Sequence, residues 1–325
     1  MRAWLVLLAA AVVALAAPRA TRARGAQNPQ QPTFRSVTDS VAVDVSVRDG
    51  ASVVATLAAS DFRVLDNGVP QEVTTAAYGK VPIDITVALD VSLSERGAPL
   101  ARLERGVLAL TSDLAADDRL RLIAFNESVH RVIDFTSSRD AIAAALPSIA
   151  AGGGTSMFDA LSTAMIAPAD PGRRQLVVAF TDGADTASTT EPAELYDTGR
   201  RASSTVDVVM PLRVVNGAVP ARPVFPNAPP TPLGRQAATL TPVMTEYVRT
   251  LTQLTSISGG RMIGDPGPPS DLGTSFRNAL NAFRSSYVIF FTPKDVDRAG
   301  FHTLTVTVPG HSNYTIHARA GYFGS

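Results

Sequence analysis

The chain contains no cysteine, and this absence excludes several kinds of site at once. Its 325 residues can form no disulfide, offer no cysteine nucleophile and carry no lipid-modified cysteine. The four histidines, at positions 130, 302, 311 and 317, show no metal-ligand spacing. We expect His302, His311 and His317 to be surface or interstrand residues. A folded domain of this chain must therefore be held together by its apolar core, with a bound metal as a further means.

An excess of charge of one sign is also missing. The 29 Lys and Arg residues balance the 29 Asp and Glu residues, and the basic residues are scattered. Nucleic-acid-binding domains show a basic patch or stripe, so we expect no nucleic-acid partner. No Gly-x-Ser-x-Gly motif occurs, and no Gly-Lys-Ser/Thr follows the glycine run 152–154. We therefore expect that the protein is not an enzyme.

Long apolar runs are absent except near the N-terminus. Arg2 precedes an apolar run from Ala3 to Ala17, and small residues follow it. The run is short for a membrane span and typical of a signal peptide. We expect residues 1–26 to be a signal peptide of a bacterial protein exported to the periplasm or the extracellular space. An uncleaved membrane anchor is the alternative, and no other segment could span a membrane.

The first folded segment has β character. After a polar linker at 27–33, residues 34–80 show about four short strands, among them 41–47, 62–65 and 69–78, with turns at Asp49-Gly50 and Asp66-Asn67-Gly68. The C-terminal segment, 286–325, shows three more strands at 286–291, 302–308 and 314–318. Because small sheets need several strands to be stable, we expect both segments to form one β-sandwich. Two separate β appendages are the alternative.

Between these segments, residues 82–285 alternate strands with helices. Such alternation predicts an α/β domain with a mainly parallel, Rossmann-like sheet and helices on both faces. The expected strands are 82–89, 119–125, 128–135, 175–180, 206–215 and 261–263. The expected helices are 100–114, 138–150, 155–166, 192–202, 244–257 and 272–283, and residues 216–240 read as a surface loop. The domain would thus be inserted between the halves of the sandwich.

Oxygen-bearing side chains follow two of the predicted buried strands. Asp90, Ser92 and Ser94 come after the first strand, Asp182 follows a later one, and Thr155 follows the glycine run. Ligands of open α/β sheets bind at the carboxyl ends of strands, and carboxylates with hydroxyls suit a divalent cation such as Mg²⁺. If the two strands are neighbours, these residues share one crevice. Taken singly, each could instead be a helix cap or an ordinary turn residue.

These motifs resemble a known family. The Asp-x-Ser-x-Ser at 90–94, Thr155 and the Thr-Asp-Gly at 181–183 resemble, in order and spacing, the metal-ion-dependent adhesion site of von Willebrand factor type A (VWA) domains. The flanking segments resemble the bacterial, largely acidobacterial, family of VWA-related domain proteins. The residues that match its signatures are Asp61-Phe62, Asp66-Asn67-Gly68 and Ala318-Arg319-Ala320-Gly321-Tyr322.

The resemblance implies a Mg²⁺ ion at the top of the sheet, with Mn²⁺ or Ca²⁺ as alternatives. Ser92 and Ser94 would coordinate it directly, Thr155 would join them in the ligand-bound state, and Asp90 and Asp182 would act mainly through water. An open coordination position would accept an Asp or Glu carboxylate from a partner protein. The function implied is thus metal-dependent protein binding, as in cell adhesion.

Two residues depart from the family pattern. Leu93 stands where a glycine is usual, and Glu95 stands where an apolar residue is usual. Glu95 could compete for the open position or lie on the first turn of a helix, where negative charge is favoured. Two other functions stay open: a metal-assisted hydrolase, whose general base would be Glu95 or Asp185, and a structural envelope protein with a non-functional site. We expect Asp185 to be a solvated loop carboxylate.

Overall fold

The computed structural model describes residues 40–79, 81–168, 170–215, 242–268 and 270–324. The predicted signal peptide, the linker and the predicted surface loop at 216–240 lie outside the described residues. Among the described residues, no helix has both the length and the apolar character needed to cross a lipid bilayer.

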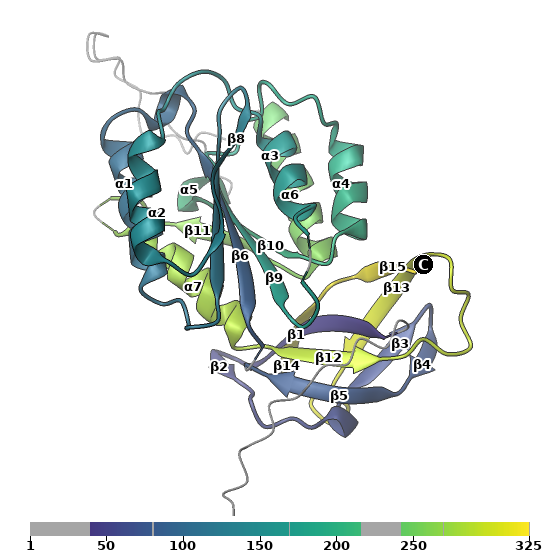
Figure 1. The fold of residues 1–325 in the computed structure, drawn as a ribbon. Coiled ribbons are helices and arrows are strands. Elements are labelled where there is room, and N and C mark those ends of the chain that lie inside the picture. Colours follow the sequence, from purple (N-terminus) through teal and green to yellow (C-terminus); the bar gives the residue numbers. More distant parts are fainter. Residues whose placement is uncertain (1–39, 80, 169, 216–241, 269, 325) are drawn as a thin grey trace, which may run out of the picture. The chain divides into compact units, whose positions relative to one another are not determined.

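A six-stranded sheet forms the α/β domain, in the order β11-β10-β9-β6-β7-β8 (Figure 1). Neighbouring strands are parallel, except that β8 runs antiparallel to β7. The central strands β6 and β9 are buried along their whole length, because their apolar, β-branched side chains are covered on both faces. The strands are β6 (Ile83–Asp90), β7 (Arg119–Phe125), β8 (Val129–Thr136), β9 (Arg174–Phe180), β10 (Thr205–Pro211) and β11 (Met262–Asp265).

Helices cover both faces of this sheet, as predicted. One apolar core joins the sheet to α1 (Ala98–Thr111), α2 (Arg139–Ala145) and α7 (Leu272–Arg284). A second core joins the opposite face to α3 (Met157–Met165), α4 (Pro192–Arg201), the short α5 (Leu212–Val215) and α6 (Pro242–Ser258). Figure 1 shows the two helical layers on either side of the sheet. The predicted Rossmann-like α/β fold is therefore confirmed.

Strands from both ends of the chain form one sandwich. A five-stranded sheet has the order β14-β1-β12-β5, with β2 paired to β1, and a four-stranded sheet has the order β15-β13-β3-β4. The N-terminal strands are β1 (Val41–Asp49), β2 (Ser52–Val53), β3 (Arg63–Asp66), β4 (Val69–Gln71) and β5 (Val73–Tyr78). The C-terminal strands are β12 (Tyr287–Phe291), β13 (Gly300–Thr307), β14 (Tyr314–Ala318) and β15 (Gly321–Gly324).

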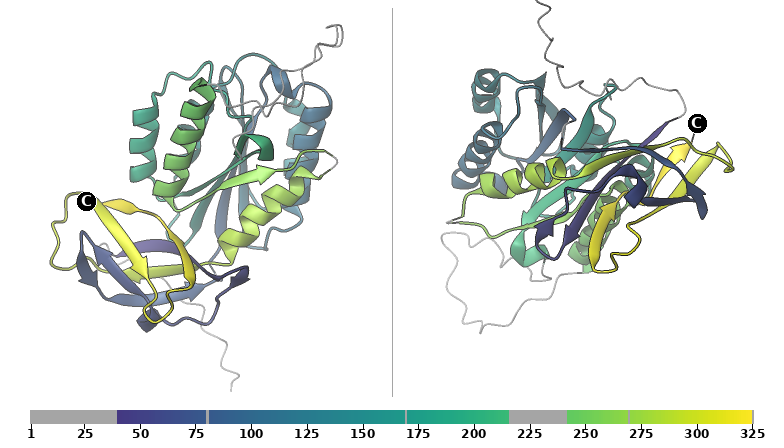
Figure 2. Two further views of the ribbon diagram at one scale, coloured as in Figure 1. Left: turned by 180° about the vertical axis from the view of Figure 1, so that it is seen from behind. Right: turned by 90° about the horizontal axis from the view of Figure 1, so that it is seen from below.

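The two sheets of the sandwich share a single apolar core. Val45 of β1, Val64 of β3, Tyr287 of β12 and Leu304 of β13 belong to it and are buried. N-terminal and C-terminal strands alternate in the path β14-β1-β12-β5, and in the other sheet β13 lies beside β3. Figure 2 shows the purple and blue N-terminal strands and the yellow C-terminal strands together in the sandwich. The predicted single sandwich is confirmed, and the alternative of two separate appendages is wrong.

The structure differs from the predicted elements in several places. Residues 69–78 form two strands, broken at Glu72, so that β4 and β5 belong to different sheets. The strand predicted over 206–215 ends at Pro211, which has no N–H to donate, and the chain continues as α5. A fourth C-terminal strand, β15, was not predicted because its four residues, rich in glycine and aromatics, show no alternation.

The two flanking signatures meet inside the sandwich. The carboxylate of Asp66 lies 2.8 Å from Nδ1 of His302 and accepts a hydrogen bond of 2.7 Å from the hydroxyl of Tyr322. His302 is 1% exposed, so it lies between strands and is not a surface residue. Arg319 donates to the carbonyls of Gly321 and Ala202. A hydrogen bond between Asp66 and Tyr322 therefore joins the N-terminal signature to the C-terminal one.

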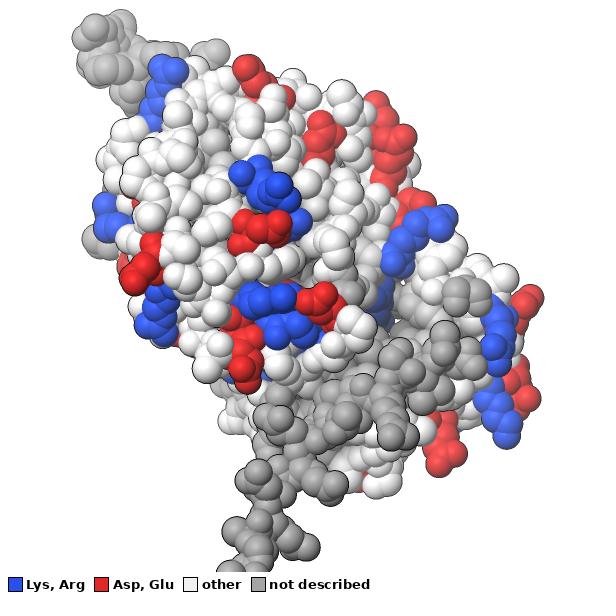
Figure 3. Space-filling view, viewed as in Figure 1, with Lys and Arg blue, Asp and Glu red and all other residues white. Residues whose placement is uncertain are grey.

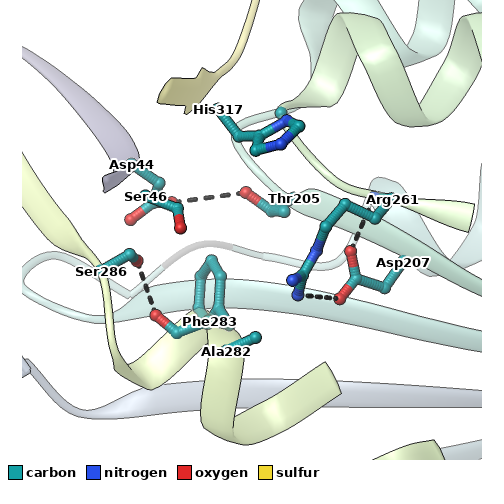
Figure 4. A pocket seen from close by; sticks show the side chains of 10 residues that line it. Asp44, Ser46, Thr205, Asp207, Arg261, Ala282, Phe283, Ser286 and His317 are labelled. Atoms are coloured by element: carbon teal, nitrogen blue, oxygen red, sulfur yellow. Dashed lines mark hydrogen bonds and ion pairs between the residues drawn. The ribbon is translucent and has the colours of Figure 1, made fainter. Parts of the chain in front are cut away.

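Polar groups line the junction between the sandwich and the α/β domain. Arg174 donates to Asp44 Oδ1 and to Ser286 Oγ, both at 2.6 Å, and its guanidinium lies 3.9 Å from the ring centre of Phe283. Figure 4 shows the adjacent cavity, of about 20 Å³, with His317 among its lining residues. This volume has room for about one water molecule, so the cavity is too small for a larger ligand.

Charge on the visible surface is mixed. Figure 3 shows acidic and basic side chains interspersed over one face of the described residues. The face has no stripe of one sign, in keeping with the balanced composition.

Candidate metal centre

The strands β6 and β9 lie side by side, and this brings the two predicted acids to one edge of the sheet. Leu89 of β6 pairs with Phe180 of β9 in parallel register. Asp90 therefore ends β6 at the level where Thr181 and Asp182 follow β9. Asp90 is fully buried, and Asp182 is partly exposed. The two acids thus approach one crevice from neighbouring strands.

A chain of short contacts joins four of the five predicted residues. The N–H of Ser92 donates to Asp90 Oδ1 at 3.0 Å, and the hydroxyl oxygens of Ser92 and Ser94 lie 3.1 Å apart. The hydroxyl of Ser94 donates to Asp182 Oδ2 at 3.2 Å. The other oxygen of Asp90 accepts a hydrogen bond of 3.0 Å from the hydroxyl of Thr181. Two carboxylates and two hydroxyls therefore face one another at the carboxyl ends of the strands.

Backbone hydrogen bonds hold the glycine loop against this group. The N–H of Gly152 donates to the carbonyl of Val91 at 2.8 Å, and the N–H of Leu93 donates to the carbonyl of Gly153 at 3.2 Å. Gly153 has a φ of 76°, which favours glycine. The loop is thus fixed to residues 91–93, and Thr155 follows it, two residues before α3 begins at Met157.

Thr155 is held by its backbone, and its hydroxyl is free of hydrogen bonds to any described residue. Its N–H donates to the hydroxyl of Thr186 at 2.9 Å, and its carbonyl accepts from the N–H groups of Thr186 and Ala187. Thr155 is 5% exposed. The hydroxyl of this largely buried residue is therefore available to a ligand from outside the chain.

Asp185 organises the neighbouring loop, and the prediction of a solvated carboxylate was wrong. Its Oδ2 accepts from the N–H of Phe158 at 2.9 Å and from the hydroxyl of Ser188 at 2.6 Å. Its Oδ1 accepts from the N–H of Ser188 at 3.1 Å. Asp185 therefore fixes the loop after β9 to the first turn of α3. The Asp-x-x-Ser spacing is the one sequence signal for this role.

Two acids of the crevice, Asp90 and Glu95, have raised pKa values, as expected of carboxylates without a counter-ion. Burial, and then the charge of Asp182, raise the pKa of Asp90 to about 6. Burial, and then the charges of Asp90 and Asp182, raise the pKa of Glu95 to about 8, although Arg102 acts in the opposite direction. Both shifts mean that negative charge is disfavoured here. A divalent cation would reverse this balance, since its charge favours the ionised acids.

The donor set fits a hard, partly hydrated cation. Among the residues that the structure describes, no three His, Asp or Glu side chains are grouped so that they could hold a metal by themselves. The five predicted residues instead offer two carboxylates and three hydroxyls, and four of them are joined by the contacts above: Asp90, Asp182, Ser92 and Ser94, with Thr155 as the fifth. Mg²⁺ prefers such oxygens and keeps several of its waters, whereas zinc prefers nitrogen and sulfur ligands.

Comparison with known families agrees with this arrangement. Residues 85–184 match the family model described as von Willebrand factor type A domain. The chain contains a VWA domain. The matched stretch runs from β6 to the residues after β9, so it includes all five of the residues in the crevice. The predicted relationship to VWA proteins is therefore confirmed.

Several solved structures resemble this VWA protein. An aerotolerance-related membrane protein from Bacteroides fragilis is 16% identical, with a TM-score of 0.45, over 62% of this chain and 98% of the other. BatB from Bacteroides thetaiotaomicron is 16% identical, with a TM-score of 0.44, over 62% and 100%. The PilB minor pilin from Streptococcus sanguinis is 13% identical, with a TM-score of 0.45, over 63% and 62%. No curated protein sequence matches the chain.

Proposed function

We propose that the VWA domain binds a divalent cation, Mg²⁺ above all, and through it a carboxylate of a partner protein. VWA domains mediate protein interactions and often bind a divalent metal. The observation that carries the proposal is the chain of contacts from Asp90 through Ser92 and Ser94 to Asp182. Four oxygen-bearing side chains lie together there. The described residues of the crevice supply no positive charge to balance the two carboxylates.

Each residue has a defined part in this proposal. The hydroxyls of Ser92 and Ser94 would hold the ion, and the free hydroxyl of Thr155 would join them when a partner binds. Asp90 and Asp182 would orient these hydroxyls and compensate the charge of the ion, mainly through water. Neutral ligands leave the ion electrophilic, so an external Asp or Glu carboxylate is a strong additional ligand.

The crevice is accessible to such a partner. Ser94 is exposed and the side chain of Leu93 is 57% exposed, although Asp90 and Ser92 beneath them are buried. A protein surface that presents a carboxylate could therefore reach the ion from solvent. Leu93 would then offer an apolar contact beside the polar one.

Binding accounts for the site better than catalysis does. The two oxygens of Asp185 accept hydrogen bonds from Phe158 and Ser188, which leaves this carboxylate poorly placed as a general base. Because one of the two candidate general bases is thus engaged by the fold, we favour binding over catalysis and propose a non-enzymatic binding protein. The apolar leader pattern at residues 1–26 supports export, and we propose that the partner is met in the periplasm or outside the cell.

Isothermal titration with Mg²⁺ and Mn²⁺ tests the metal site. The wild-type protein should bind one ion, and Asp182→Ala should lose measurable binding. Asp134→Asn is the matched control, since Asp134 is an exposed acid of the edge strand β8. Capture of a partner from the envelope fraction of the source organism should require Mg²⁺ and should be abolished by EDTA and by Asp182→Ala. Capture that persists in EDTA would refute metal-dependent binding.

A further inference from the structure

One exposed arginine, Arg96, connects the two loops that carry the hydroxyls of the candidate metal centre. It follows the 3-10 turn Leu93–Glu95, two residues after Ser94, and both Arg96 and Ser94 are exposed. Nε of Arg96 donates to the carbonyl of Ala151 at 3.2 Å. The side chain therefore reaches from the loop that carries Ser94 to the glycine loop that precedes Thr155.

The guanidinium group of Arg96 lies against the glycine loop. A Cβ atom at Gly152 would lie 3.2 Å from Nη2 of Arg96, so the guanidinium packs on the bare backbone of this glycine. The N–H of Gly152 donates to the carbonyl of Val91, and the carbonyl of Gly153 accepts from the N–H of Leu93. The guanidinium therefore lies on a loop that is itself bonded to the residues around the metal centre.

The charge of Arg96 is not balanced by any described residue. Its Nη1 and Nη2 atoms donate to no described residue, and it forms no ion pair with a described acid. Arg96 is also not among the charges that act on Asp90. A guanidinium with free N–H groups can bind a carboxylate through two parallel hydrogen bonds. Arg96 is thus available to a carboxylate from outside the chain.

One acid faces the same loop. A Cβ atom at Gly153 would lie 2.9 Å from Oε2 of Glu127, an exposed residue between β7 and β8. The glycine loop therefore has one charge of each sign beside it, Arg96 at Gly152 and Glu127 at Gly153. A carboxylate that approaches this loop is attracted by Arg96 alone.

We propose that Arg96 determines which partners bind, because it binds a second carboxylate of a partner whose first carboxylate binds the metal ion. Ser94 and Arg96 are two residues apart, so their Cα atoms are at most about 7 Å apart, and one short segment can reach both. The partner would then present two neighbouring acidic side chains. This inference rests on the proposed function and adds the chemistry of the partner.

Binding of dicarboxylates, each compared with its own monoamide, tests this inference. Succinate, glutarate, adipate and pimelate differ in the distance that they span, and each monoamide keeps the shape but has only one carboxylate. In excess Mg²⁺, NMR titration of the wild type should show that the dicarboxylate of best-fitting length binds about tenfold more tightly than its monoamide.

Variants of single charged residues show whether this preference comes from Arg96. Arg96→Gln should reduce the preference to less than about twofold, with affinities for Mg²⁺ and for the monoamide within about twofold of the wild type. Arg96→Lys keeps the charge but not the two parallel bonds, so its preference should be intermediate. Arg63→Gln, at an exposed arginine of β3 in the sandwich, is the matched control and should keep the full preference. Glu127→Gln should bind the preferred dicarboxylate at least as tightly as the wild type, because a like charge is removed.

The outcomes separate this inference from the proposed function. If the wild type does not bind Mg²⁺, or binds no monoamide in its presence, the proposed function fails and the role of Arg96 fails with it. If the wild type binds both and prefers no dicarboxylate, or if Arg96→Gln keeps the preference, the role of Arg96 alone is refuted. Loss of Mg²⁺ affinity in Arg96→Gln, or loss of the preference in Glu127→Gln, would likewise refute it.

Discussion

The strand β6 carries a fully buried aspartate near each of its ends, and the charges around the two carboxylates are of opposite sign. Asp84, near the start, accepts hydrogen bonds from Arg119 at 2.8 and 2.5 Å and from Arg173 at 2.6 Å. Asp90, at the other end, contacts only hydroxyl and backbone donors among the described residues, and its nearest charges are acids. One end of the sheet supplies its own cations, and the other lacks one. This difference supports the proposal that Asp84 stabilises the fold and that Asp90 belongs to a ligand site.

The largest effect on stability is expected at Asp84, whose charge is balanced by two arginines. Asp84→Asn removes the charge that Arg119 and Arg173 share, and it should lower the free energy of unfolding by about 3 kcal/mol, because two partly buried guanidinium groups lose their buried carboxylate partner. The loss should be the same with and without Mg²⁺. Urea unfolding in both buffers measures it, and a loss that Mg²⁺ restores would remove the distinction between the two ends.

The next effect is expected from the ion itself. Mg²⁺ at about one hundred times its Kd should stabilise the wild type by about 2.7 kcal/mol, since it binds the folded state alone. Asp90→Asn should lose this gain, and in metal-free buffer it should be at least as stable as the wild type. Thermal unfolding with and without Mg²⁺ provides the measurement. Strong destabilisation of metal-free Asp90→Asn would show that Asp90 is a structural acid like Asp84.

These two predictions depend on features that the sequence shows unequally. The apolar run of β6 and the order of Asp90, Ser92, Ser94, Thr155 and Asp182 predicted the fold and the crevice, because strand ends and residue order fix where such side chains lie. The partners of Asp84 come from 35 and 89 residues along the chain, and no local pattern joins them.

Burial of single polar residues was the other part that the sequence did not show. The position of Glu95 stayed open between a helix turn and the metal site, because its burial depends on how the 3-10 turn packs. His302 read as an ordinary strand residue, because its partners Asp66 and Tyr322 come from two distant segments. Tertiary contacts of this kind decide where polar side chains lie, and hydrophobic periodicity does not report them.

A smaller effect is expected from pH. Folding raises the pKa of Asp90 to about 6 and that of Glu95 to about 8, so the folded state binds more protons than the unfolded state between about pH 4 and pH 8. Metal-free stability should therefore contain a contribution that falls by about 1–2 kcal/mol as the pH rises through this window. Urea unfolding from pH 5 to pH 8 should show a flatter profile for Glu95→Gln. Identical profiles would contradict the clustering of acids at this end.

The smallest effect is expected at Leu93. Its side chain is 57% exposed, and it offers no oxygen to the ion. Leu93→Gly should change Mg²⁺ affinity by less than about twofold, in line with the small effects of most surface substitutions. Partner capture in Mg²⁺ should weaken, since the apolar contact is removed. Titration and capture with the same preparation measure both, and a large loss of Mg²⁺ affinity would show that Leu93 shapes the crevice.

The most direct measurement is the change in Tm on addition of Mg²⁺, compared between Asp84→Asn and Asp90→Asn. The account predicts that Mg²⁺ raises the Tm of the wild type and of Asp84→Asn, whose baseline is lower, and leaves that of Asp90→Asn unchanged. An equal rise in Asp90→Asn, or no rise in the wild type, would contradict the claim that this end of the sheet lacks a cation that it is built to bind.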